Sequence, residues 1–106
     1  MSQHIIPVAS PKAGRVIVTV GYDPALHEAF MNLCDDDGEP SYTSPSGIGV
    51  GDIPRLAQEQ LGIALPLSVI DGVQRDVADL RTGAIDVARR MTQYNSDGTV
   101  SEAVRW

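Results

Sequence analysis

The chain has 106 residues and a mass of 11.3 kDa, a size typical of one folded domain. Eight Lys and Arg against fourteen Asp and Glu give a net charge of −6. This acidic excess argues against direct nucleic-acid binding and against a polybasic membrane anchor, since both need clustered cations. No apolar run approaches the ~18 residues of a transmembrane helix. A single cysteine, Cys34, excludes an intramolecular disulfide, and we therefore predict a cytoplasmic protein.

The N-terminal segment contains two prolines and shows no sustained hydrophobic period. We predict a loosely ordered arm over residues 1–13, although Ile5, Ile6 and Val8 could dock on the body. Residues 14–106 are predicted to form a single α+β domain.

A β-branched run over residues 15–20 predicts the first strand. Residues 26–34 are ambiguous because their apolar positions satisfy both strand and helix periods. We favour a strand, because the following residues 36–39, Asp-Asp-Gly-Glu, are typical of a hairpin turn and residues 41–43 can form a third strand. The sequence therefore predicts an antiparallel meander over residues 14–43.

Residues 52–61 carry an apolar stripe at helical spacing, which predicts the first helix. Asp52 is the expected N-cap, since its carboxylate can accept a bond from a free backbone N–H. Gly62 is expected to close this helix in a left-handed conformation.

Residues 68–82 predict a second helix, because apolar residues again recur every three or four positions. Ser68 followed by Asp71 resembles a capping box, with Asp in place of the usual Glu or Gln. Gly72 weakens this helix by about 1 kcal/mol relative to alanine. Gly83 is expected to end it.

The C-terminal segment predicts a hairpin, because Asn95-Ser96-Asp97-Gly98 lies between two stretches bearing Val, Thr and Tyr. A helix through residues 84–91 remains an alternative. The predicted fold is α+β: an antiparallel sheet, made of the N-terminal meander and the C-terminal hairpin, covered on one face by two helices.

No catalytic or metal-binding pattern is evident. His4 and His27 do not have zinc-ligand spacing, and the three aspartates after Cys34 disfavour its thiolate. The glycine-rich residues 47–51 depart from phosphate-binding spacings, and residues 35–39 lack the rest of a calcium loop. We predict no catalytic residue, no cofactor and no metal.

The leading hypothesis is a non-catalytic accessory or inhibitory protein that binds another protein with a basic surface. Acidic and aromatic side chains are the candidate contacts, because aromatics dominate interface energies. These candidates are Tyr22, Asp35, Asp36, Asp37, Glu39, Tyr42, Tyr94 and Trp106. Two alternatives stay open: a homodimer formed through edge strands, and a small ligand-binding domain or enzyme that uses His27 and Cys34.

Two segments carry a resemblance to a known group. Residues 20–30 read Val-Gly-Tyr-Asp-Pro-Ala-Leu-His-Glu-Ala-Phe, and residues 61–66 read Leu-Gly-Ile-Ala-Leu-Pro. They resemble small uncharacterised bacterial proteins of plasmids and integrating elements, which carry V-G-[YW]-D-x-x-L-x-x-F-F and then L-G-[IV]-x-[LV]-P. The chain departs from that pattern at Ala29-Phe30, where two aromatics are usual. The resemblance implies a mobile-element accessory protein and a strand–hairpin–helix order, without a mechanism.

Overall fold

The computed structural model describes residues 2–83 and 90–105. The choice between helix and strand over residues 84–89 and the candidate residue Trp106 lie outside this part of the chain. The elements, in order, are β1 (Gln3–Ser10), β2 (Gly14–Asp23), β3 (Glu28–Asp35), β4 (Pro40–Thr43), the 3₁₀ turn η1 (Val50–Asp52), α1 (Ile53–Leu61), α2 (Leu67–Arg81), β5 (Arg90–Tyr94) and β6 (Val100–Arg105).

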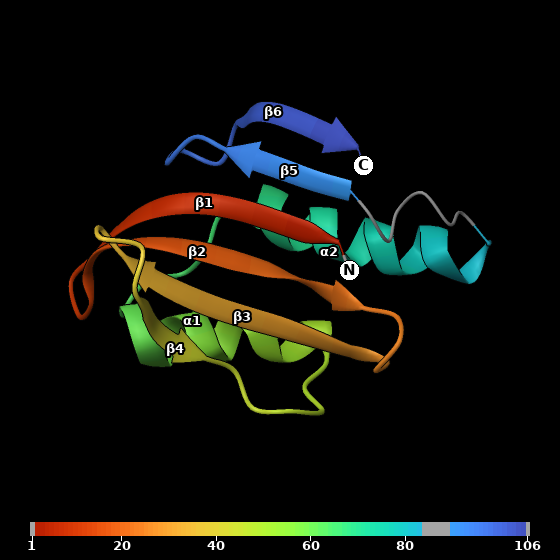
Figure 1. Cartoon of the computed structure of the whole chain (residues 1–106), viewed down its shortest axis with the longest axis horizontal. Helices are drawn as coiled ribbons and strands as arrows, with labels where there is room; N and C mark the ends of the chain where they lie inside the picture. The colour runs from red at the N-terminus through yellow and green to blue at the C-terminus, as the bar shows by residue number, and fades with distance from the viewer. Residues whose placement is uncertain (1, 84–89, 106) are drawn as a thin grey trace.

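One six-stranded sheet organises the molecule, with the strand order β4-β3-β2-β1-β5-β6. Every neighbouring pair is antiparallel except β1 and β5, which run parallel. Both helices lie behind the sheet in Figure 1, so they cover one of its faces. The predicted α+β class is therefore confirmed, as are the two helices, the strand nature of β3, and the C-terminal hairpin where the structure describes it.

The period-two alternation of the strands decides which face is covered. Val16, Val18 and Val20 of β2 are at most 3% exposed, while Ile17 between them is 38% exposed. The same alternation in β3 buries Ala29, Met31 and Leu33. These side chains pack against the apolar stripes of both helices, and the hydrophobic effect of that burial holds the two layers together.

The expectation of a loosely ordered N-terminal arm is wrong. Residues 3–10 form β1, which lies inside the sheet between β2 and β5, and Ile6 is completely buried. The β-branched residues of this segment favour a strand despite Pro7. This proline is tolerated because it lies beyond the parallel pairing of residues 3–5 with β5. β5 does not pair with β1 at Pro7, so β1 is an edge strand on that side, where a residue without a backbone N–H is tolerated.

Two predicted helix caps are also corrected. The Asp52 carboxylate accepts the N–H of Gly49 at 2.9 Å, so it caps the turn η1 and not α1. Helix α2 begins at Leu67 without a side-chain cap, and the Ser68 hydroxyl donates instead to the carbonyl oxygen of Gly98 at 2.6 Å. Gly62 closes α1 in the left-handed conformation, at φ 76°, as predicted. None of the helices within residues 2–83 and 90–105 is long and apolar enough to cross a membrane.

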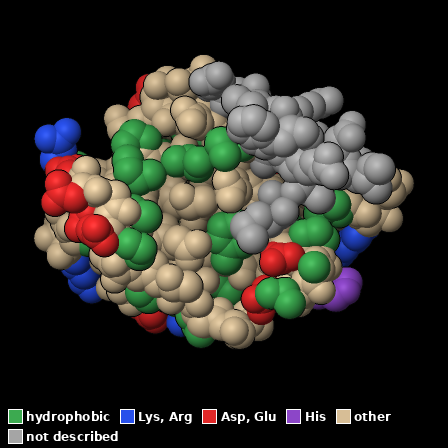
Figure 2. Space-filling model, viewed as in Figure 1, with side chains coloured by type: hydrophobic (Ala, Val, Ile, Leu, Met, Phe, Trp, Pro, Cys, Tyr) green, Lys and Arg blue, Asp and Glu red, His purple; other side chains and the backbone are tan. Residues whose placement is uncertain are grey.

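Among residues 2–83 and 90–105, no helix covers the other face of the sheet, which Figure 2 shows toward the viewer. We call it the open face and define it by the outward-facing residues of the first three strands. Hydrophobic and uncharged polar side chains occupy its middle, whereas most acidic and basic side chains lie toward the outline of the molecule. The uncharged residues are Gln3, Ile5, Pro7, Ala9, Ile17, Thr19, Gly21, Phe30, Asn32 and Cys34.

Candidate functional site

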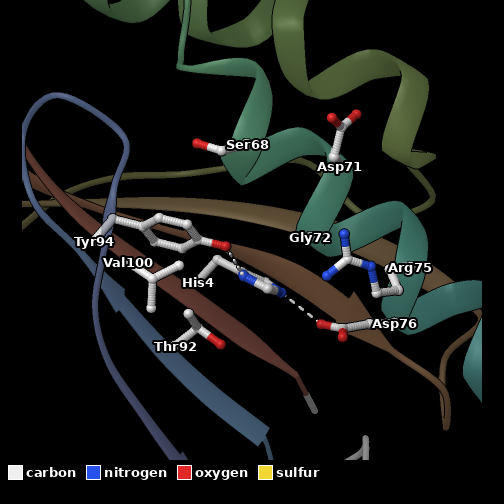
Figure 3. A pocket seen from close by; sticks show the side chains of 9 residues that line it. All are labelled: His4, Ser68, Asp71, Gly72, Arg75, Asp76, Thr92, Tyr94 and Val100. Atoms are coloured by element: carbon white, nitrogen blue, oxygen red, sulfur yellow. Dashed lines mark hydrogen bonds and ion pairs between the residues drawn. The ribbon is translucent and has the colours of Figure 1, made fainter.

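A buried polar cluster lies between the sheet and α2. It consists of His4 from β1, Asp76 from α2 and Tyr94 from β5, which are 3%, 1% and 6% exposed. His4 Nε2 lies 2.5 Å from Asp76 Oδ2, and His4 Nδ1 lies 2.8 Å from the Tyr94 hydroxyl oxygen. Dashed lines mark both contacts in Figure 3. The imidazole therefore connects three elements that are far apart in sequence.

A glycine on α2 makes this close approach feasible. A Cβ atom at Gly72 would lie 2.7 Å from the Tyr94 hydroxyl oxygen and 2.8 Å from His4 Cε1. Real Cβ atoms do not approach other heavy atoms so closely, so any larger residue would force α2, His4 or Tyr94 to shift. The helix-weakening glycine noted in the sequence thus has a packing reason.

The hydrogen bonds of the cluster restrict its chemistry. A carboxylate accepts only, so His4 Nε2 donates to Asp76, and Nδ1 is engaged with the Tyr94 hydroxyl. Burial raises the pKa of Tyr94, the negative charge of Asp76 raises it further, and Arg75 opposes them. The phenol therefore remains protonated at neutral pH, and both ring nitrogens are already bonded. This arrangement suits a structural link better than a nucleophile or a general base.

A pocket of about 410 Å³ opens beside the cluster, between α2 and the β5–β6 hairpin. Its size lies at the lower end of the range for small-molecule sites. Arg75 turns toward the cluster, whereas the carboxylate of Asp71 points away from it (Figure 3). The full lining is His4, Ser68, Asp71, Gly72, Arg75, Asp76, Thr92, Tyr94 and Val100.

The predicted acidic candidates lie together in the β3–β4 turn. Asp35 Oδ1 accepts the N–H groups of Asp37 and Glu39 at 3.0 and 2.9 Å, which fixes the turn. Asp36, Asp37 and Glu39 are exposed at its tip. The turn therefore displays three carboxylates at one end of the sheet.

The three tyrosine candidates do not join this group on a common surface. Tyr22 and Tyr42 are half-buried and pack against the core, and Tyr94 belongs to the buried cluster. Their rings serve the interior, which is what a chain with few aromatic residues needs.

The alternative based on His27 and Cys34 is contradicted. His27 lies in the β2–β3 turn and Cys34 near the far end of β3, so the extended strand separates them by about 23 Å. A cysteine–histidine pair cannot form across that distance.

Sequence reasoning missed His4 and Asp76. His4 falls in the segment expected to be a loose arm, and Asp76 is not among the predicted site residues. One available signal was that Asp76 follows Val69 and Val73 at helical spacing, on the stripe that faces the sheet. A carboxylate on a buried stripe needs a polar partner, and His4 is that partner.

Comparison of the chain with protein-family models, curated proteins and solved structures finds no match. Its function is therefore inferred from the geometry of the cluster, the acidic turn and the open face.

Proposed function

We propose that this protein is a non-catalytic interaction protein, accessory or inhibitory in role, which binds another protein through the open face of its sheet. The observation that carries this proposal is the uncharged middle of that face, where Ile17, Pro7 and Ala9 are exposed and Phe30 is half-buried. A chain with 21% charged residues normally places charge on a solvated sheet face. An uncharged face of this extent is typical of the centre of an interface.

The ends of the open face support a partner with basic groups. Asp36, Asp37 and Glu39 lie at one end, so a partner surface with an apolar centre and Lys or Arg at its rim is complementary. Rim charges of this kind speed association and select partners more than they add affinity.

The buried cluster supports a non-catalytic role, because His4 is fully bonded within the fold. The half-buried thiol of Cys34 fits a reducing compartment, so we place the interaction in the cytoplasm. The resemblance to bacterial mobile-element proteins fits an accessory role.

Retention experiments with a native lysate test the proposal. Immobilised wild type is compared with Ile17→Glu, which puts a charge into the open face, and with Leu67→Glu, a matched control on α2 where the native side chain is 78% exposed. The expected result is a specific protein, or the endogenous copy of this chain, retained by wild type and by Leu67→Glu and lost with Ile17→Glu. Equal retention by all three proteins would contradict the proposal.

A second candidate function is the binding of a small molecule in the pocket beside His4. Its favouring observation is that Arg75 turns into a partly apolar pocket that also contains hydroxyl groups. A small carboxylate or inorganic phosphate would then raise the melting temperature of wild type but not of Arg75→Gln. An unchanged melting temperature at millimolar concentrations of both probes would remove this candidate.

A further inference from the structure

We infer that the partner on the open face is a second copy of the same chain, related by a two-fold axis that runs parallel to the strands between β2 and β3. This inference rests on the proposed function and names its partner. An axis in this position exchanges β1 with β4 and β2 with β3, so the same patch is used by both copies.

Charge at one end of the open face is self-complementary about this axis. Arg15 lies near the start of β2, and Asp36 follows the end of β3, next to the register pair Val16 and Asp35. Both line a surface depression of about 290 Å³ together with Ile17. The two-fold axis therefore sets Arg15 of each copy against Asp36 of the other, forming two equivalent ion pairs.

Asp36 is available for this contact. Its carboxylate is exposed and accepts no hydrogen bond among the described residues, and Arg15 makes no ion pair within 4.0 Å there. The carboxylates at the opposite end are already used within the chain: Asp23 accepts the N–H of Ala25, and Glu28 accepts that of Gly47. The basic group that an acidic turn needs is thus supplied by the chain itself, despite its net charge of −6.

The middle of the face is complementary about the same axis. Residues in register on β2 and β3 face each other across such an interface, because aligned sheets cross at only about 30°. Thr19 is in register with Asn32, whose side-chain oxygen is buried without a hydrogen-bond partner in the described part of the chain. A rotation about the broad last torsion of Asn32 turns this oxygen outward. The hydroxyl of Thr19 from the second copy can then donate to it.

The size of the face predicts a reversible dimer. Together with the shorter β4, which the axis sets against β1, the open face covers at most about 26 by 19 Å, or roughly 500 Å², at the usual rise and spacing. A standard interface buries about 800 Å² on each partner. The face is therefore large enough for a specific contact but small for an obligate one, and we expect a dissociation constant of about 1–100 μM.

Charge-swapped variants test this arrangement. Sedimentation is measured from about 1 to 500 μM, to bracket this range, for wild type, Arg15→Glu, Asp36→Arg and an equimolar mixture of the two variants. Each variant alone sets like charges together and should weaken self-association by about tenfold or more. The mixture recreates both opposite-charge pairs between chains and should return to within about threefold of wild type. Arg55→Glu, at an exposed position on α1, changes the net charge by the same amount as Arg15→Glu and should leave association unchanged.

Recovery of association in the mixture would show that the ion pairs form between chains, since neither variant has an opposite-charge pair at these positions within its own chain. Thermal unfolding of each variant confirms that both are folded. A wild type that is monomeric at every concentration, or a mixture without recovery, would overturn the inference. If wild type is monomeric but the lysate yields a partner sensitive to Ile17→Glu, the proposed function stands and only the second copy is wrong. If neither is observed, both are wrong.

Discussion

The two faces of the sheet differ in what their side chains stabilise. On the covered face, apolar residues surround the polar cluster in which His4 is bonded through both ring nitrogens. On the open face, Thr19 and Asn32 lie among exposed and half-buried apolar residues, and the Asn32 side-chain oxygen has no hydrogen-bond partner in the described residues. Because successive residues of one strand point to opposite faces, neighbouring positions have separate roles. Substitutions on the covered face should change the free energy of unfolding, and substitutions on the open face should change association.

The largest expected effect on folding follows removal of the buried carboxylate. Asp76→Ala removes the acceptor 2.5 Å from His4 Nε2 and should lower the free energy of unfolding by about 2–4 kcal/mol, because a charge-assisted hydrogen bond is lost and a buried N–H is left without that acceptor. Urea unfolding measures the change. Asp71→Ala, at an exposed position of the same helix, is the control and should change stability by less than about 0.5 kcal/mol. Similar losses of unfolding free energy in both variants would show that the buried cluster contributes no more to stability than an exposed position of α2.

The second prediction concerns the glycine that lets α2 approach the cluster. Gly72→Ala should destabilise by about 1–3 kcal/mol, because the added methyl group overlaps Tyr94 and His4. In an unconstrained helix the same change would stabilise by about 1 kcal/mol, so the sign is diagnostic. Gly51→Ala, where nothing lies within 4 Å of the new Cβ and φ is not positive, should be neutral or slightly stabilising. A stabilised Gly72→Ala variant would contradict the described packing.

The fold could be predicted wherever a local signal agrees with the tertiary structure. Helical spacing located both helices, and Gly62 marked the end of α1 in the expected conformation. The turn chemistry of residues 36–39 correctly decided the strand nature of β3. These signals depend on residues that are close together in the sequence, so a single sequence is enough to recognise them.

The position of β1 and the polar cluster could not be predicted in the same way. β1 becomes an internal strand only because β5 pairs with it in parallel from the far end of the chain. His4 and Asp76 meet through that long-range pairing, and no sequence spacing relates them. The acidic turn was recognised as a turn, but its relation to Arg15 and the open face depends on the strand register.

Two adjacent residues of β2 give the most direct test of the difference between faces. Val18 is completely buried and Ile17 is 38% exposed. Val18→Ala should cost about 1.5–2 kcal/mol of unfolding free energy, through lost burial and the cavity left behind. Ile17→Ala should cost less than about 1 kcal/mol, the span of strand propensities, and should weaken self-association instead. Equal losses of stability would mean that the open face is covered within one chain.

The smallest expected effect is a change in alkaline stability. Burial raises the pKa of Tyr94, the charge of Asp76 adds to the rise, and Arg75 opposes it. A raised pKa in the folded state means that the protonated phenol is favoured there. Its stabilising contribution is complete below pH ~10, the ordinary value for tyrosine, and is lost as the pH rises through the raised value.

Tyr94→Phe removes this dependence together with the hydrogen bond to His4. At neutral pH the variant should be less stable than wild type by about 1 kcal/mol. The difference should narrow as the pH is raised above ~10, because only wild type loses the contribution of the phenol there. Urea unfolding at a series of pH values between neutrality and strong alkali measures both changes. A difference that stays constant throughout would mean that Tyr94 titrates alike in the folded and unfolded chains, which a phenol held between His4 and Gly72 should not do.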